Sequence, residues 1–176
     1  MKALVVPYEF GDVRLRLLTS ADLPMTLAWR NRDQIRIWMK NKQPLQLESH
    51  RNWFVSYEQC ENEYMFIIEE RQSSVAIAQV GIYQIDHDQG EAEIGRFIAA
   101  PQGIGRGLAK QGMKAMCDWA LGPLRLNRVY CDIYADNLAS IRACEWAGFH
   151  IIGSKGEFLM LERRADDANS NQKAAG

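Results

Sequence analysis

The sequence has little excess charge and no long hydrophobic run, and each of these scarcities excludes a class of protein. Its 21 Lys and Arg residues nearly balance its 22 Asp and Glu residues, so we expect no general attraction to nucleic acid. No apolar run reaches the roughly 20 residues of a membrane-spanning helix, and Pro7 interrupts the first apolar segment too early for a signal peptide. We therefore expect a cytoplasmic protein that binds neither nucleic acid nor membrane.

Cysteine is also scarce, and its spacing excludes the usual zinc motifs. The sequence has 4 cysteines, with no C-x-x-C pair and no histidine at the spacing of a zinc ligand. We expect free thiols in a reducing compartment and no metal site. A chain of 176 residues that is 47% apolar suits one well-packed domain. We assign residues 1–164 to that domain and expect the polar segment 165–176 to be a disordered tail.

Hydrophobic periodicity predicts a mixed order of strands and helices. The segments that alternate like strands are residues 13–18, 64–70, 75–85, 91–98, 128–134, 149–153 and 156–162. The segments with helical spacing begin at Ser20, Asp33, Gln46, Leu108 and Asn137. This order predicts one α/β (α+β) domain, with a mixed, mostly antiparallel sheet of about seven strands flanked by helices.

A glycine-rich loop lies between the predicted strand 91–98 and the helix that begins at Leu108. Gly103, Gly105 and Gly107 alternate with other residues there. Glycine allows the backbone to approach a phosphate closely, and the first amides of the following helix point at it unpaired. The loop lacks the Lys-Ser/Thr of a P-loop and the G-x-G-x-x-G of a dinucleotide fold. A phosphate site of another type and a plain glycine-rich turn both fit.

The spacing Gln102-x-x-Gly105-x-Gly107 resembles the coenzyme A loop of the GCN5-related N-acetyltransferases, the GNAT superfamily. A second segment, from Asn137 to Phe149, resembles that family's motif Asn-x-x-Ala-x-x-x-Tyr-x-x-x-Gly-Phe. Asn137 is also a good N-cap and Gly148 a good C-cap, so helix capping alone explains both ends. The resemblance implies the GNAT fold, with acetyl-CoA as co-substrate.

The resemblance further implies a set of residues that hold coenzyme A. Backbone groups at the end of the strand would hold the pantetheine and polarise the thioester carbonyl, and amides of the loop would bind the pyrophosphate. Gln102 stands where many relatives have Arg, which removes one direct charge contact. The implied coenzyme A residues are Phe97, Ile98, Ala100, Gln102, Gly103, Ile104, Gly105, Arg106, Gly107, Leu108 and Asn137.

Amide formation needs a base for the acceptor ammonium and an acid for the leaving thiolate. Glu93 matches a position where relatives often carry an acidic residue, and it shares a strand face with Glu91. A solvated or hydrogen-bonded glutamate is the alternative. Cys144 stands at the family's tyrosine position, where a thiol could serve as the acid, although a free cysteine more often packs in a core. Tyr134 is a second candidate acid, or core.

The N-terminal third predicts the acceptor. It contains Trp29-Arg30-Asn31, then Ile35-Arg36-x-Trp38-Met39-x-Asn41, followed by His50-x-x-Trp53. This string resembles the N-acetyltransferases of the pseudaminic acid pathway, which acetylate a 4-amino sugar carried on UDP. The resemblance implies that Arg30 and His50 contact the nucleotide diphosphate, for which arginine supplies forked hydrogen bonds. It implies that Trp38 and Met39 line the acceptor pocket. The alternative is that the tryptophans pack in the core, the arginines are surface charges and His50 is structural.

Three functions remain open. The leading one is an acetyl-CoA-dependent N-acetyltransferase in which the primary amine of a UDP-4-amino-4,6-dideoxy sugar attacks the donor directly. The second is an acetyltransferase for a protein α-amine, of the ribosomal-protein type, although the cationic segment around Arg30 has the wrong charge for a basic peptide. The third is a noncatalytic acyl-CoA-binding module, because Cys144 replaces the tyrosine. We expect a monomer or homodimer with a small-molecule acceptor.

Overall fold

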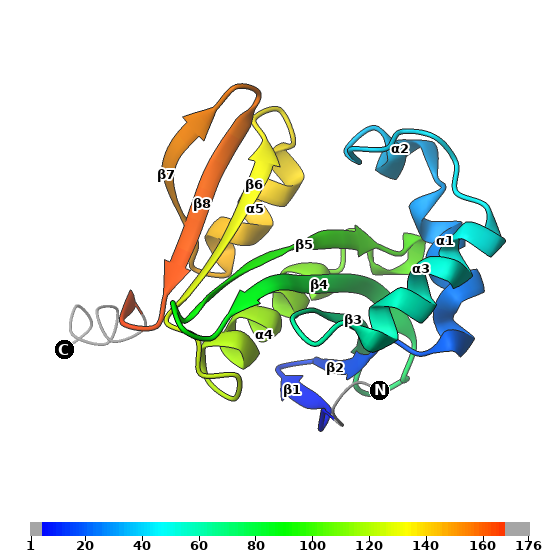
Figure 1. The fold of residues 1–176 in the computed structure, drawn as a ribbon, viewed down its shortest axis with the longest axis horizontal. Helices are drawn as coiled ribbons and strands as arrows, with labels where there is room; N and C mark the ends of the chain where they lie inside the picture. Colours follow the sequence, from blue (N-terminus) through cyan, green and yellow to red (C-terminus); the bar gives the residue numbers. More distant parts are fainter. Residues whose placement is uncertain (1–4, 168–176) are drawn as a thin grey trace.

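A mixed sheet forms the centre of the computed structural model, which describes residues 5–167 (Figure 1). Its strand order is β1-β2-β3-β4-β5-β6-β8-β7, and every neighbouring pair is antiparallel except β5 and β6. The strands are β1 (Tyr8–Phe10), β2 (Val13–Leu17), β3 (Tyr64–Glu70), β4 (Ala76–Asp86), β5 (Glu91–Ala99), β6 (Arg128–Tyr134), β7 (His150–Lys155) and β8 (Phe158–Arg164). The mostly antiparallel sheet is therefore confirmed. The prediction missed β1, because three residues are too few to show alternation.

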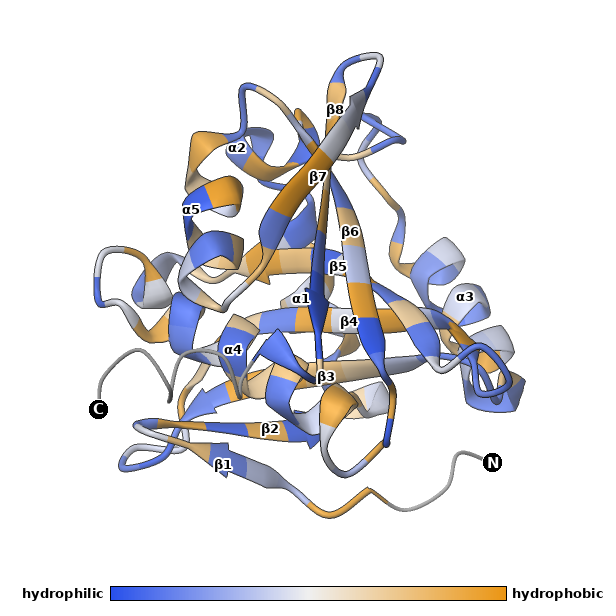
Figure 2. Ribbon diagram, turned by 90° about the vertical axis from the view of Figure 1, so that its left-hand side faces the viewer, coloured by the Kyte–Doolittle hydropathy of each residue, from blue (hydrophilic) through white to orange (hydrophobic). Residues whose placement is uncertain are grey.

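Helices cover both faces of this sheet. Figure 2 shows α4 and α5 on one side of it and α3 on the other. The helix predicted to begin at Asp33 does so, and it ends at Arg36. The helices are η1 (Ser20–Asp22), α1 (Leu23–Arg30), α2 (Asp33–Arg36), α3 (Leu47–Gln59), η2 (Pro101–Gly103), α4 (Leu108–Leu121) and α5 (Leu138–Trp146). Of the predicted tail, residues 168–176 lie outside the described part of the chain.

The main core lies between the sheet and α4. The Trp119 ring packs edge-on against Phe66, with ring centroids 4.8 Å apart, and against Tyr64 at 5.6 Å. Met113 and Met116 lie on the same buried face of α4, as its apolar spacing predicts. The long helix after the glycine loop is thus fixed against the sheet by its buried face.

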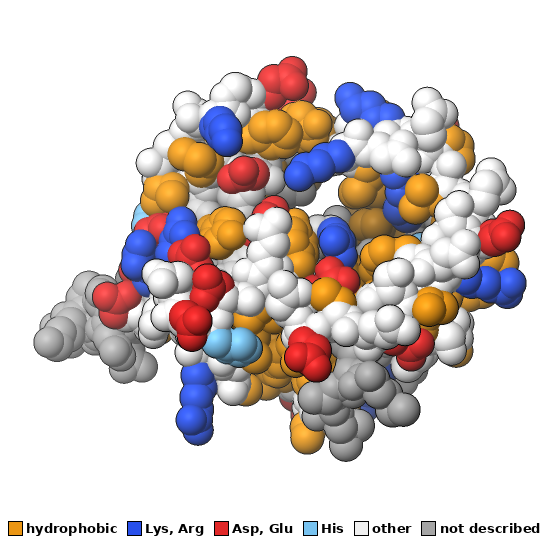
Figure 3. All heavy atoms as spheres, viewed as in Figure 1, with side chains coloured by type: hydrophobic (Ala, Val, Ile, Leu, Met, Phe, Trp, Pro, Cys, Tyr) orange, Lys and Arg blue, Asp and Glu red, His pale blue; other side chains and the backbone are white. Residues whose placement is uncertain are grey.

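The sheet divides at the junction of β5 and β6. These strands pair only at Glu91↔Arg128, Ala92↔Val129 and Glu93↔Tyr130. Beyond Glu93, β5 stays with β4 while β6 follows β8, so the two halves diverge (Figure 1). A register shift in the β4–β5 ladder and the positive φ of Arg96, 51°, bend β5 at this place. The space-filling view shows a hollow between the two halves (Figure 3).

A cluster of buried charges fixes the start of the first helix on the sheet. Arg16 donates to both oxygens of Asp22, at 2.7 and 2.8 Å, and to Glu69 at 2.6 Å. Asp22 and Glu69 are only 7% and 6% exposed. Burial would raise the pKa of Asp22, but the hydrogen bonds from Arg16 and Thr19 hold that pKa below its ordinary value. Arg16 is thus the cationic partner of Asp22 and shares Glu69 with Arg14, which donates to the other carboxylate oxygen of Glu69 at 2.7 Å.

Replacing Arg16 by methionine should strongly destabilise the protein. The Arg16→Met change leaves Asp22 and Glu69 buried with less compensation, which costs about 3 kcal/mol in the free energy of unfolding. Urea denaturation measures this loss. The control is Arg71→Met, since Arg71 and its partner Glu9 are 46% and 49% exposed. That change should cost less than about 1 kcal/mol, and equal costs for the two variants would contradict the assignment.

Candidate functional site

The glycine loop between β5 and α4 uses its three glycines in two ways. Gly105 and Gly107 have φ angles of 77° and 71°, a left-handed conformation that other residues adopt at a cost. Gly103 is required for space, because a Cβ there would lie 2.5 Å from the carbonyl oxygen of Ile77. The loop is thus packed closely onto β4 at Gly103 and turns freely at the other two glycines.

The second half of this loop presents unpaired amides. Within residues 5–167, the backbone N–H groups of Gly105, Arg106, Gly107 and Leu108 have no hydrogen-bond acceptor. They stand at the N-terminus of α4, whose 14 residues add a helix dipole of the sign that attracts an anion. These four groups fit a pyrophosphate.

The first half of the loop is committed to its own structure, which corrects part of the prediction. The amides of Gly103 and Ile104 donate to the carbonyls of Ala100 and Pro101, at 3.0 and 3.3 Å. The amide of Ala100 donates to Ile77, at 2.8 Å. These three predicted amides are therefore not free for a ligand.

Three predicted side chains beside the loop also have structural partners. Gln102 donates its carboxamide to the carbonyl of Ala76, at 2.7 Å, which ties the loop to β4. Arg106 forms an ion pair with Glu70. The Oδ1 of Asn137 accepts from the amide of Ser140, at 3.3 Å, as the N-cap of α5. The capping interpretation of Asn137 is thus confirmed.

The end of β5 has a strand on one side only. Ile98 pairs with Gln79 of β4, and no strand among residues 5–167 pairs with the other edge of β5 beyond Glu93. Alternate peptide groups of this segment therefore face the gap between β5 and β6 without a ladder partner. The side chains of Ile98 and Phe97 pack into the interior, Ile98 beside Trp29. The carbonyl of Ala99 accepts a hydrogen bond from Arg32, and that of Arg96 accepts one from the side chain of Gln79, at 3.5 Å. The remaining backbone groups of this edge are the ones available to a ligand.

Glu93 and Glu91 have different partners, although they share a strand face. Glu91 forms an ion pair with Arg128, at 2.8 Å. Glu93 lies at the last β5–β6 pair, and its Oε1 accepts a hydrogen bond from the hydroxyl of Tyr83, at 2.7 Å. Glu93 is therefore a carboxylate without a cationic partner among the described residues, at the vertex of the divergence. The prediction missed Tyr83, since only strand pairing brings it to Glu93.

Cys144 lies in the core, which argues against its predicted role as an acid. Its side chain is 2% exposed and packs with the main core. A hydrogen bond with Cys144 and burial raise the pKa of Cys131, and burial raises the pKa of Cys117 to about 12. The thiols of Cys131 and Cys117, both buried, lie near Cys144, so the packing alternative describes it better. All four cysteines are free.

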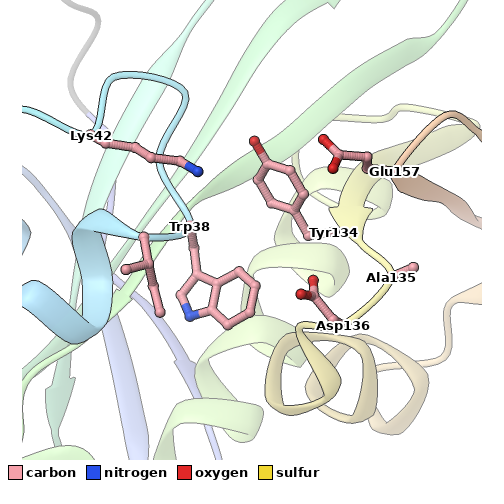
Figure 4. A pocket seen from close by; sticks show the side chains of 7 residues that line it. Trp38, Lys42, Tyr134, Ala135, Asp136 and Glu157 are labelled. Atoms are coloured by element: carbon pink, nitrogen blue, oxygen red, sulfur yellow. The ribbon is translucent and has the colours of Figure 1, made fainter.

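Trp38 and Tyr134 meet in one pocket of about 280 Å³ (Figure 4). Their ring centroids are 6.2 Å apart. Trp38 comes from the segment after α2 and Tyr134 from the end of β6, so the pocket lies between that segment and the half of the sheet that contains β6 and β8. The other residues that line it are Ile37, Lys42, Ala135, Asp136 and Glu157. Lys42, Asp136 and Glu157 lie in loops, where no periodic pattern marks them.

The other residues of the predicted acceptor site do not line this pocket. Arg30 is 8% exposed and donates to the carbonyls of Asn41 and Gln43, so it holds the segment that carries Trp38. Met39 packs against the cluster around Trp29. Arg30 and Met39 therefore support the segment that carries Trp38 and do not line the pocket, which corrects the expectation of direct contact there.

His50 is held by neighbours on two sides. Its Nε2 lies 3.1 Å from the hydroxyl of Thr26, and its ring stacks on Trp53 with centroids 5.2 Å apart. Burial and the charge of Arg30 lower the pKa of His50, so its ring is neutral near pH 7. A neutral ring supplies no charge to a diphosphate, and the structural alternative fits this geometry.

Neither a metal centre nor a membrane span is found in the described part of the chain. Residues 5–167 contain no group of three or more His, Cys, Asp or Glu side chains placed to hold a metal ion. No helix there is both long enough and apolar enough to cross a bilayer.

The fold and the anion site together define the family. The model of the GNAT acetyltransferase domain matches residues 12–150, and the chain belongs to this family. It carries an acetyl-CoA-dependent N-acetyltransferase domain. The free amides of Gly105–Leu108 fit the pyrophosphate of the donor.

Particular relatives differ in their acceptors. The chain is 26% identical over 163 residues to an aminoglycoside N(6')-acetyltransferase of Klebsiella pneumoniae, covering 87% of this chain and 81% of that protein. It is 25% identical over 142 residues to an uncharacterised protein of Methanocaldococcus jannaschii, covering 80% of this chain but only 28% of that protein. The structure of FdhC, a nucleotide-linked sugar GNAT, matches with a TM-score of 0.80 at 16% identity, covering 99% of this chain and 97% of FdhC. Spermidine N-acetyltransferase from Vibrio cholerae, in complex with CoA and spermine, matches at 0.77 and 20% identity, covering 89% and 97%.

A methyl group at Gly103 should weaken coenzyme A binding. In Gly103→Ala the new Cβ meets the backbone of Ile77, so the loop must move and carry its free amides away from their present positions. We expect the dissociation constant of coenzyme A to rise roughly tenfold, about 1.4 kcal/mol, by isothermal titration calorimetry. Gly156→Ala is the control, since Gly156 lies in the β7–β8 turn with open space around it, and its positive φ, 59°, places the strain of the change away from the loop. Its affinity should stay unchanged.

Proposed function

We propose that the protein transfers the acetyl group of acetyl-CoA to the primary amine of a nucleotide-linked amino sugar, of the UDP-4-amino-4,6-dideoxy type. The charge of the acceptor segment, residues 29–43, is the observation that supports this most. The segment contains five Lys and Arg residues and a single acid, Asp33, which pairs with Arg36. A nucleotide diphosphate is attracted to such a surface, whereas a polyamine or an aminoglycoside is repelled.

The donor would lie between the two halves of the sheet. The free amides of Gly105–Leu108 would hold its pyrophosphate, and backbone groups on the edge of β5 that β6 leaves beyond Glu93 would hold its pantetheine. Acetyl-CoA supplies a thioester carbonyl as the electrophile. Glu93, at the vertex, takes a proton from the acceptor ammonium so that the amine can attack. Tyr134 is the proposed donor of a proton to the leaving thiolate, because Cys144 is buried and Tyr134 lines the pocket.

The pocket of Trp38 and Tyr134 would receive the sugar. Its two aromatic rings offer apolar faces, and Lys42 brings a positive charge on one side for the phosphates. Asp136 and Glu157 lie on the opposite wall, where their carboxylates can accept hydrogen bonds from sugar hydroxyls and from the ammonium. The four free thiols are compatible with a reducing compartment, and we place this reaction in the cytoplasm.

One observation favours a second candidate. Asp136 and Glu157 would also attract a cationic acceptor, such as the N-terminus of a basic peptide. The cationic segment 29–43 borders the same pocket, which makes this acceptor the weaker of the two.

An acceptor panel distinguishes these candidates. Purified protein with acetyl-CoA is offered UDP-4-amino-4,6-dideoxy sugars, spermidine, an aminoglycoside and N-terminal ribosomal peptides, and thiol release is followed. We expect kcat/KM for a nucleotide sugar to exceed the others by about 100-fold, the scale of roughly 3 kcal/mol of differential binding. Turnover of peptides or polyamines without turnover of any nucleotide sugar would overturn the proposal.

Reversing the charge of Lys42 should weaken acceptor binding selectively. In Lys42→Glu we expect the KM of the nucleotide sugar to rise about tenfold, because an attractive charge becomes a repulsive one. The KM of acetyl-CoA should stay unchanged. Lys40→Glu is the matched control, since Lys40 is an exposed lysine of the same segment that does not line the pocket. Equal effects of the two changes would indicate only a general field effect.

A further inference from the structure

The hydroxyl of Tyr83 is aimed at Glu93 by three features of the sheet. The two residues are cross-strand partners in the β4–β5 ladder, and the hydroxyl lies 2.7 Å from Oε1 of Glu93. Gly95 leaves the room for it, because a Cβ at Gly95 would lie 2.5 Å from the Tyr83 hydroxyl oxygen. The guanidinium of Arg96 covers the Tyr83 ring, 4.6 Å from its centroid, and is itself paired with Glu63 at 3.1 Å. The ring is therefore held at its edge and on its face.

The chemistry of the pair assigns the donor and the acceptor. Burial and the neighbouring Glu93 carboxylate raise the pKa of Tyr83, so its hydroxyl keeps its proton and donates it to Oε1. No other hydrogen bond to the Glu93 carboxylate is found within residues 5–167. The second oxygen, Oε2, therefore remains as a proton acceptor at the vertex of β5 and β6.

We infer that Tyr83 is a positioning residue for the transfer reaction, which holds the Glu93 carboxylate in one orientation and leaves Oε2 for the acceptor ammonium. This inference rests on the proposed role of Glu93 as base. In the reaction an N–H bond of the ammonium breaks and its proton passes to Oε2. The nitrogen lone pair then forms the N–C bond and the C–S bond breaks. The nitrogen loses a second proton to solvent as the amide forms, and the leaving thiolate takes up one proton from the hydroxyl of Tyr134, which regains a proton from solvent. A fixed carboxylate avoids the loss of rate that follows from a small displacement of a catalytic group.

A double-mutant cycle tests the inference. Tyr83→Phe removes only the hydroxyl, and we expect kcat to fall about tenfold while the KM of acetyl-CoA is unchanged. Glu93→Gln should lower kcat by about 10²–10⁴. Because Tyr83 acts through Glu93, adding Tyr83→Phe to Glu93→Gln should cost nothing further. A structural role of Tyr83 would instead give the same tenfold loss in both backgrounds.

Two further variants serve as an independent test and as a control for the cycle. Gly95→Ala displaces the Tyr83 hydroxyl without altering Tyr83 or Glu93, so its loss of kcat should match that of Tyr83→Phe and should also vanish in Glu93→Gln. Tyr130→Phe is the control: Tyr130 pairs with Glu93 in the β5–β6 ladder but does not hydrogen-bond to it. Its kcat should stay within about twofold of the unmodified protein, as for a group outside the coupled pair.

The result of the double-mutant cycle does not depend on which acceptor the protein uses. The cycle is measured with whichever amine of the panel is acetylated fastest, and with the slow hydrolysis of acetyl-CoA by water if none is. If a polyamine is acetylated and the nucleotide sugar is not, the proposed substrate is wrong, but the cycle still tests the role of Tyr83. The inference is overturned if Tyr83→Phe leaves kcat unchanged, if its effect persists in Glu93→Gln, or if Glu93→Gln itself has no effect.

Discussion

Everything at this site depends on the place where β5 and β6 stop pairing. A parallel ladder that continued to Ala99 would close the sheet, use the free edge of β5, and leave Glu93 facing solvent on an unbroken surface. The ladder ends instead at Glu93↔Tyr130, where β5 bends at Arg96 to remain with β4. The same bend supplies the unpaired backbone, the space between the halves and the carboxylate at their junction.

The elements with strong periodicity were predictable from the sequence. The strands from β2 onward and α4 carry alternating or helical apolar spacing, and the structure has them within a few residues of the expected bounds. The glycine loop was predictable because a close approach and a left-handed turn both require glycine. The short strand β1 was not, since its three residues pair with β2 without any pattern of their own.

The candidate site was predictable only where a residue type or spacing marks it. Trp38 and Tyr134 were expected in different roles, and the fold brings them into one pocket. Tyr83 becomes a partner of Glu93 through strand register, which a single sequence does not state. Cys144 shows the opposite error: its place in a motif suggested chemistry, but burial among thiols makes it part of the core. Arg30 was expected to bind a ligand and instead binds backbone carbonyls.

The acceptor segment is built unlike the rest of the molecule. Helix α2 buries none of its own residues, and the segment is held by side-chain hydrogen bonds to its backbone, from Arg30, Arg36 and Asn31. Trp29, Ile35 and Met39 fix the first part of the segment on the apolar cluster with Ile98, so the exposed end, residues 40–43, is the part that can open locally at a free energy below that of global unfolding. The segment can also accept new side chains at positions such as Trp38 and Lys42 while those anchors stay. Substitutions at Trp38 and Lys42 can therefore change the acceptor in evolution with little loss of fold stability.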